Sequence, residues 1–408
     1  MYELVVKSAR LRGHEVPLNL GVDGGRIVRI ASEDLSGEEV INANGNLVTE
    51  PFVNPHLHLC KVYTLEKIGD RALSLYQERN MKKAAAAVKA ASEVKKAYRE
   101  DVIYENAKSA LLEAVRYGCL YLRAFVDTDT IARNTAVRAV LRLKREFEKF
   151  LTIQVVAFPQ EGVVKDSGSA EIVWKAVEQG CDVVGGIPWI EDSTRDARIH
   201  VQKIFEIARE FDKDVAFLTD DCGNRASKTT ELVAVTAIQQ RWEGRATVHH
   251  ARAMSLYTEK YLNKVIQLLK KAGITVVLNP HTGPLHAPVH KLCENGVNVA
   301  LGQDDIADAY YPFGRNKMLE IAFLASHFFR TMTMDSFDKI FNMITVNPAK
   351  SMRLKNYGIK PGSEASFVIH DAKTVYEAIW HQADPRYVFS RGTLVYEKHV
   401  DERWHLPL

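Results

Sequence analysis

The chain has 408 residues, of which 46% are hydrophobic and 26% charged, which is typical of a soluble globular protein with room for more than one structural unit. Its 54 basic and 51 acidic residues leave a formal charge of only +3, so the charge gives no reason to expect a nucleic acid or a membrane as partner. The cysteines form no CxxC pair, the N-terminus lacks a signal-peptide core, and no apolar run approaches the roughly 20 residues that span a bilayer. These features predict a cytoplasmic protein.

Short strands are predicted near both ends of the chain. Residues 3–6 and 25–30 alternate apolar and polar side chains, which indicates a small antiparallel sheet with one face in water. Two more short strands are predicted near the C-terminus. Because chain ends often lie together, we predict one small β domain built from residues 1–47 and 350–408.

Residues 48–349 have a different pattern, in which short apolar runs alternate with helical stretches. The clearest helix is predicted over residues 101–117, where apolar side chains follow one face, and it ends at Gly118. Eight strands are predicted, at residues 48–53, 120–126, 152–158, 182–187, 215–219, 246–248, 274–278 and 297–301. This alternation predicts a (β/α)8 barrel. A doubly wound open sheet is the alternative, but it would normally carry a glycine-rich loop after its first strand.

Two histidines, His56 and His58, occupy that place instead, in the motif NPHLHL. Residues two apart on an extended strand point to the same side, so these imidazoles can share one divalent cation such as zinc. For an isolated His-x-His motif, two polar residues at a strand end are an equally good interpretation. The ends of the other strands therefore decide between the two.

Residues that bind metals, move protons or grip ligands follow most of the predicted strands. They are His56, His58, Asp127, Gln160, Glu161, Asp220, Asp221, His249, His250, Asn279, His281, Gln303, Asp304 and Asp305. Reactive groups of a (β/α)8 barrel lie at the C-terminal ends of its strands, so we predict that these residues form one site.

A metal held by His56, His58 and Asp304 would keep open positions for water, and a bound water has its pKa lowered towards neutrality. Asp304, Asp221 and His250 are the candidates for the proton transfers that hydrolysis needs. Asp221 could instead cap the following helix. One of His249 and His250 is expected to point away from the site, because neighbours on a strand face opposite sides.

Five segments of the chain, in this order, resemble the amidohydrolase superfamily and, within it, the cytosine deaminase-like branch. They are PHLHL (55–59), VAFPQEG (156–162), VVGGIP (183–188), His250 with Ala253-Met254, and GQDD (302–305) with YPFG (311–314). The resemblance covers nearly the whole chain. It implies a (β/α)8 barrel with a small β-sandwich made from both chain ends, and one divalent metal, zinc or iron. The implied activity is hydrolysis, by metal-activated water, of a non-peptide C–N bond in a small nitrogen heterocycle such as cytosine, isoguanine, a pterin, creatinine or a triazine.

The resemblance also implies roles for individual residues. His56, His58 and Asp304 would bind the metal, and Asp304 would also accept a proton. His250 would orient the attacking water and the substrate. Gln160 would hydrogen-bond the ring amide, and Asp305 and Tyr310 would line the pocket. Lys61 adjoins the His-x-His strand, and we expect it to touch the substrate.

Four positions depart from the family pattern. Leu218 occupies the position of a strand-5 histidine that is a metal ligand in the family, and leucine cannot bind a metal. Phe125 and Trp189 replace other histidines, and Cys60 replaces an aspartate. The site is either rebuilt for a more apolar ligand, with metal held by fewer groups and aided by Cys60 or His249, or the barrel is a catalytically degenerate ligand-binding protein.

Substrate choice depends on the pocket loops at residues 60–70 and 281–290. The pattern leaves open whether His281, His286 and His290 lie in the pocket or on the surface. A small heterocyclic molecule is the expected partner, and the family resemblance is compatible with a homo-oligomer.

Overall fold

The computed structural model describes residues 1–67, 73–74, 92–308, 310–399, 403 and 405. Its larger part is a barrel of eight parallel strands, each hydrogen-bonded to the next along the chain. The strands are β6 (Phe52–Leu57), β7 (Cys119–Asp127), β8 (Thr152–Phe158), β9 (Val183–Gly186), β10 (Asp214–Thr219), β11 (Ala246–His250), β12 (Thr275–Leu278) and β13 (Val299–Leu301). The predicted (β/α)8 architecture is confirmed.

The barrel closes between its first and last strands at a short seam. The His58 amide donates to the Asp304 carbonyl and the Asp304 amide donates to the His56 carbonyl, both at 2.8 Å. The buried side chain of Asn54 spans the same seam, because its Oδ1 accepts from the amides of Gln303 (3.0 Å) and His56 (3.2 Å). The seam therefore carries the His-x-His motif on one side and Asp304 on the other.

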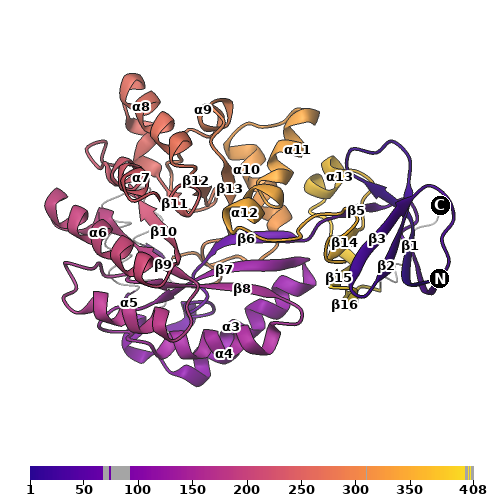
Figure 1. Cartoon of the computed structure of the whole chain (residues 1–408), viewed down its shortest axis with the longest axis horizontal. Coiled ribbons are helices and arrows are strands. Elements are labelled where there is room, and N and C mark those ends of the chain that lie inside the picture. Colours follow the sequence, from indigo (N-terminus) through magenta and orange to yellow (C-terminus); the bar gives the residue numbers. More distant parts are fainter. Residues whose placement is uncertain (68–72, 75–91, 309, 400–402, 404, 406–408) are drawn as a thin grey trace.

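Helices cover the outside of the barrel (Figure 1). Their inward faces carry apolar residues at helical spacing, such as Val137, Val140 and Leu141. The α-helices are α3 (Glu100–Arg116), α4 (Thr135–Phe147), α5 (Ser169–Glu178), α6 (Thr194–Glu210), α7 (Thr229–Gln239), α8 (Glu259–Lys271), α9 (Val289–Glu294), α10 (Met318–Phe328), α11 (Met334–Asn342) and α12 (Val346–Ser351). Short 3-10 helices are η1 (Leu65–Lys67), η2 (Glu93–Ala97), η3 (Pro188–Ile190) and η4 (Arg252–Leu256). Within the described parts of the chain, no helix has the length and apolar character needed to cross a bilayer.

Both ends of the chain contribute to a second sheet, drawn at the right of Figure 1 beside the barrel. Its strands are β1 (Tyr2–Leu11), β2 (Leu18–Asp23), β3 (Arg26–Ala31), β4 (Gly37–Asn42), β5 (Leu47–Thr49), β14 (Phe367–His370), β15 (Pro385–Ser390) and β16 (Thr393–Glu397). The helix α13 (Val375–Trp380), between β14 and β15 in the chain, packs on α10 and α11 of the barrel. The sheet joins the two ends where β5 runs antiparallel to β14. It is mixed rather than antiparallel, because β1 pairs in parallel with β4 and β5.

The prediction of one strand at residues 48–53 is wrong, because this segment is divided between two sheets. It forms β5 in the small sheet, then Glu50 and Pro51 outside any strand, then β6 in the barrel. Proline has no amide to donate to a ladder, so a break at Pro51 is where a strand is expected to change sheets. The domain limits 1–47, 48–349 and 350–408 stay a prediction.

Candidate active site

Three buried donor atoms meet at the seam of the barrel. His56 Nε2 lies 3.3 Å from His58 Nε2 and 3.2 Å from Asp304 Oδ1, and His58 Nε2 lies 3.7 Å from the same oxygen. Ligands about 2.1 Å from a tetrahedral ion lie about 3.4 Å from one another, so these separations fit a shared metal. Gly302 permits this approach, because a Cβ there would lie 2.7 Å from the Cβ of His56.

His250 lies beside this group. One of its ring nitrogens, one of His56 and one carboxylate oxygen of Asp304 all lie within 4.8 Å of one another. Its Nε2 is also 4.0 Å from Asp221 Oδ2. His250 therefore lies close both to the candidate metal ligands and to the carboxylate of Asp221.

The backbone at the site is unusual. Asp220, His250 and Asp304 have φ angles of 47°, 64° and 68°, in the left-handed region that residues other than glycine rarely adopt. Such strained positions concentrate at functional sites. The left-handed turn at His250 also ends the alternation of β11, so the expectation that either His249 or His250 points away is wrong. Both rings contact His56, with centroid separations of 4.6 and 5.1 Å.

Asp221 and Asp304 are held by two residues that the sequence did not single out, Arg252 and Thr282. The Arg252 Nε donates to Asp221 Oδ1, and another of its guanidinium nitrogens donates to Thr282 Oγ1 at 2.8 Å. Thr282 Oγ1 in turn donates to Asp304 Oδ2 at 3.0 Å. No local pattern marks Arg252 or Thr282, because their burial depends on the loops after β11 and β12 coming together.

Asp220, not Asp221, caps the helix that follows β10. Its carboxylate accepts from the backbone amides of Thr229 (2.7 Å) and Thr230 (3.0 Å), and also from the hydroxyls of Ser227 (2.6 Å) and Tyr257 (2.9 Å). The alternative role of Asp221 as a helix cap is therefore wrong. Asp221 is left facing His250.

We expect Asp220→Ala to lower the free energy of unfolding by about 2–4 kcal/mol, because it leaves buried amides and hydroxyls without an acceptor. Urea denaturation of the metal-free protein measures this. Ser227→Ala removes a single hydroxyl donor and is expected to cost about 1 kcal/mol. Equal effects of the two substitutions would contradict the capping role.

On the other side of the site, Lys61 is buried and holds two polar partners. Its Nζ donates to Gln160 Oε1 at 2.7 Å and lies 3.1 Å from Asp127 Oδ1. It also lies 5.5 Å from the centre of the Tyr310 ring. Burial opposes the charge on Lys61, but Asp127 overcomes it, and the pKa of Lys61 is raised. Lys61 therefore stays cationic and fixes the orientation of the Gln160 amide.

Several buried polar atoms around this pocket have no hydrogen-bond partner among the described residues. They include both ring nitrogens of His281, Asp305 Oδ1, the Tyr310 hydroxyl and Asn279 Oδ1. Each such group costs about 1–3 kcal/mol when left unpaired, which points to a polar ligand or water as partner. Burial and the neighbouring carboxylates of Asp304 and Asp308 raise the pKa of Asp305.

Phe125 and Leu218 form part of an apolar face beside the candidate metal ligands. Phe125 stacks on His56, with ring centroids 4.4 Å apart and planes 20° apart. Leu218, only 3% exposed, packs with Phe125 and Phe158. The Cys60 Sγ contacts the Phe125 carbonyl at 3.8 Å and the Tyr98 hydroxyl at 3.7 Å, and burial raises the pKa of its thiol to about 12.

The three loop histidines have different surroundings. His281 is half-buried, and its ring centroid lies 4.4 Å from that of Tyr311. His286 contacts the rings of Phe328 and Phe329, and His290 Nε2 is 2.8 Å from the Phe329 carbonyl oxygen. Residues 68–70 of the other predicted loop lie outside the described residues.

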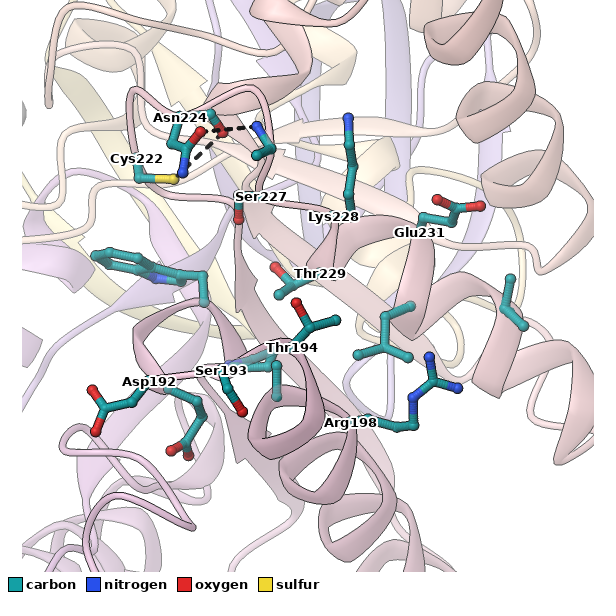
Figure 2. A pocket seen from close by; sticks show the side chains of 17 residues that line it. Asp192, Ser193, Thr194, Arg198, Cys222, Asn224, Ser227, Lys228, Thr229 and Glu231 are labelled. Atoms are coloured by element: carbon teal, nitrogen blue, oxygen red, sulfur yellow. Dashed lines mark hydrogen bonds between the residues drawn. The ribbon is translucent and has the colours of Figure 1, made fainter.

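A separate cavity of about 730 Å³ opens between the first turns of α6 and α7. Figure 2 shows Ser193 and Thr194 on one side of it and Lys228 and Thr229 on the other. Trp189 also lines it, whereas His56, His58 and Asp304 do not. The cavity is therefore a neighbour of the candidate metal site and shares none of its donors.

Comparison with known proteins agrees with this geometry. Residues 132–396 match the amidohydrolase family. The chain belongs to this family, and within it to the cytosine deaminase-like branch. It is 30% identical over 403 residues to N-isopropylammelide isopropyl amidohydrolase of Pseudomonas sp. strain ADP, covering 98% of each chain.

Two solved structures extend the comparison over almost the full length. The 5-methylcytosine deaminase of Klebsiella pneumoniae, with bound 5-fluorocytosine, is 27% identical, with a TM-score of 0.90 over 98% of this chain and 99% of that one. The N-isopropylammelide isopropylaminohydrolase of Burkholderia multivorans is 24% identical, with a TM-score of 0.86 over 97% and 98% of the two chains. Because its identity is only 24%, the Burkholderia multivorans structure supports the fold alone.

Proposed function

We propose that this protein is a metal-dependent hydrolase that cleaves a non-peptide C–N bond of a small nitrogen heterocycle. The observation that carries the proposal is the separation of 3.2–3.7 Å among the donors of His56, His58 and Asp304. Two imidazoles and one carboxylate suit zinc or iron, and three protein ligands leave a position open for water, as in catalytic zinc sites. The names of the relatives, an amidohydrolase and a deaminase of small heterocycles, support the same reaction.

The residues around the three candidate metal ligands are placed to carry out the proton transfers. A divalent metal, when bound, would lower the pKa of its water ligand towards neutrality. Asp304 Oδ1 faces the imidazoles while its Oδ2 accepts from Thr282, which places this carboxylate both to hold the metal and to take a proton from the water. Asp221 is held by Arg252 next to His250, which lets this pair hold or release a second proton.

The pocket residues suggest how a heterocycle is held. With Gln160 Oε1 occupied by Lys61, the Gln160 amide nitrogen is the part left to donate to a ring acceptor. The Tyr310 hydroxyl adds a further donor, and the Phe125–Leu218 face provides an apolar wall. A flat ring with adjacent nitrogen and carbonyl groups matches this mixture.

A catalytically degenerate binding barrel is the second candidate, and the buried apolar Leu218 at a ligand position favours it. The two candidates differ in metal content. A hydrolase needs the ion in the wild-type chain, whereas a degenerate barrel binds heterocycles without it.

We expect the purified protein to hold about one zinc or iron per chain, as a mononuclear site requires. At a metal concentration 100-fold above the Kd, binding stabilises the fold by about 2.7 kcal/mol, so a chelator should lower the Tm. Elemental mass spectrometry and calorimetry test this, together with amine and ammonia release from cytosine, 5-methylcytosine, pterin and N-isopropylammelide. A metal-free wild type that binds a heterocycle without turnover would support the second candidate.

A further inference from the structure

His249 occupies a place that neither the metal site nor the pocket has so far explained. It is fully buried, and in the parallel pairing of β10 with β11 it lies opposite Leu218. Residues paired in this way point to the same face of the sheet. An imidazole is therefore present on the strand adjacent to the one that lacks the family's ligand, at the same level of the barrel.

Both ring nitrogens of His249 have defined partners. Its Nδ1 lies 2.7 Å from Nδ1 of His56, and its Nε2 lies 2.9 Å from Thr247 Oγ1. Thr247 Oγ1 also accepts from Arg123 at 3.3 Å, and Arg123 is anchored by Gln154 Oε1 at 2.8 Å. His249 thus connects a rigid polar cluster inside the barrel to the far side of the His56 ring.

The contact between two Nδ1 atoms can form only if one carries a proton and the other accepts it. If His249 donates, the proton of neutral His56 sits on Nε2, where it points at Asp304 Oδ1 and blocks a metal. If His56 donates, its Nε2 has a free lone pair, and His249 carries its own proton on Nε2 and donates a hydrogen bond from there to Thr247 Oγ1. Only the second arrangement leaves His56 able to ligate an ion.

We propose that His249 is a positioning residue of the metal centre, which accepts the Nδ1 proton of His56 and so directs the His56 Nε2 lone pair at the ion. This inference rests on the proposed metal-dependent function. His249 does not replace Leu218 as a ligand, because its two nitrogens are engaged with His56 and Thr247. It strengthens one of the remaining ligands instead, and the Phe125 ring stacked on His56 fixes the plane of that ligand.

The test measures the zinc Kd by competition with a chelating dye, alongside the unfolding free energy of each metal-free variant. His249→Leu removes the acceptor and is expected to raise the zinc Kd about 10–100-fold. His249→Asn places an amide oxygen near the position of Nδ1 and is expected to stay within about threefold of wild type. A rescue by asparagine is not expected of a residue that only fills space.

His370→Leu is a matched control, because His370 is also fully buried and also bonds a threonine, Thr49, through Nε2 at 2.8 Å. It lies in β14, away from the site, and its zinc Kd should equal that of wild type. If His249→Leu does not fold, Thr247→Val interrupts the same chain of hydrogen bonds one bond further from the metal. We expect this variant to raise the zinc Kd by about threefold to tenfold, less than His249→Leu, because Thr247 acts on the ligand only through His249.

The outcomes separate the two proposals. A wild type that binds zinc, with His249→Leu or, failing that, Thr247→Val binding it equally well, would overturn the role of His249 and leave the hydrolase proposal standing. A wild type without measurable zinc affinity would overturn both.

Discussion

Replacing Asp304 by asparagine is expected to lower kcat/KM by about 10³–10⁴-fold, which is the upper range for loss of a general base. Asparagine keeps the shape of the side chain and can still accept from Thr282, but it cannot take a proton and is a weaker metal ligand. The measurement is steady-state kinetics on the best substrate of the heterocycle panel, with metal content determined on the same samples. Residual activity above a tenth of wild type would contradict the role of Asp304.

Asp182→Asn is the control for this substitution. Asp182 directly precedes β9 and so lies at the opposite end of the barrel, where it accepts from Lys144 at 2.7 Å and from the Val155 amide at 2.8 Å. Asp182 is therefore a hydrogen-bonded carboxylate like Asp304, but it has no contact with the candidate metal site. We expect a loss of stability and no change in kcat/KM for this variant.

The second large effect is expected at Leu218. Leu218→His should lower the unfolding free energy of the metal-free protein by about 2–4 kcal/mol, because it removes buried apolar surface and places an imidazole among apolar side chains. The residues it would meet include Phe125, Val156 and Phe158. Urea denaturation measures the loss, and Leu218→Met, which conserves volume, should cost less than about 1.5 kcal/mol.

The same variant separates an active enzyme from a degenerate one. In an active enzyme the wild type already holds its ion, so Leu218→His should not raise metal content or turnover. A wild type without metal and a Leu218→His variant that gains both would show that strand β10 has lost a ligand on which catalysis depended.

Much of the barrel was predictable, because its strands are short apolar runs separated by amphipathic helices. The strand at residues 152–158 has the predicted bounds. The break between β5 and β6 was not predictable from periodicity, because residues 48–53 were predicted as one apolar strand and only the pairing partners show that the segment belongs to two sheets. The local pattern of apolar residues predicts which residues are buried, but it does not predict which sheet a strand joins.

The candidate site was predictable only where strand-end position and residue type coincide, as for His56, His58 and Asp304. The left-handed backbone at His250 has no sequence signal, because residues other than glycine rarely adopt it. The same holds for Arg252, whose partners Asp221 and Thr282 come from distant loops. Side-chain contacts of this kind depend on tertiary packing, which periodicity does not encode.

The seam that closes the barrel has a consequence for the order of folding. Asn54 and Gln303, which it joins by a hydrogen bond, are 249 residues apart in the chain. Contacts of such sequence separation are costly in loop entropy and form late. Because His56 and Asp304 lie on opposite sides of this seam, a partly synthesised or partly folded chain has no complete set of donors. Metal uptake would therefore report that the last strand has joined the first, and opening of the seam alone would release the ion before the rest of the barrel unfolds.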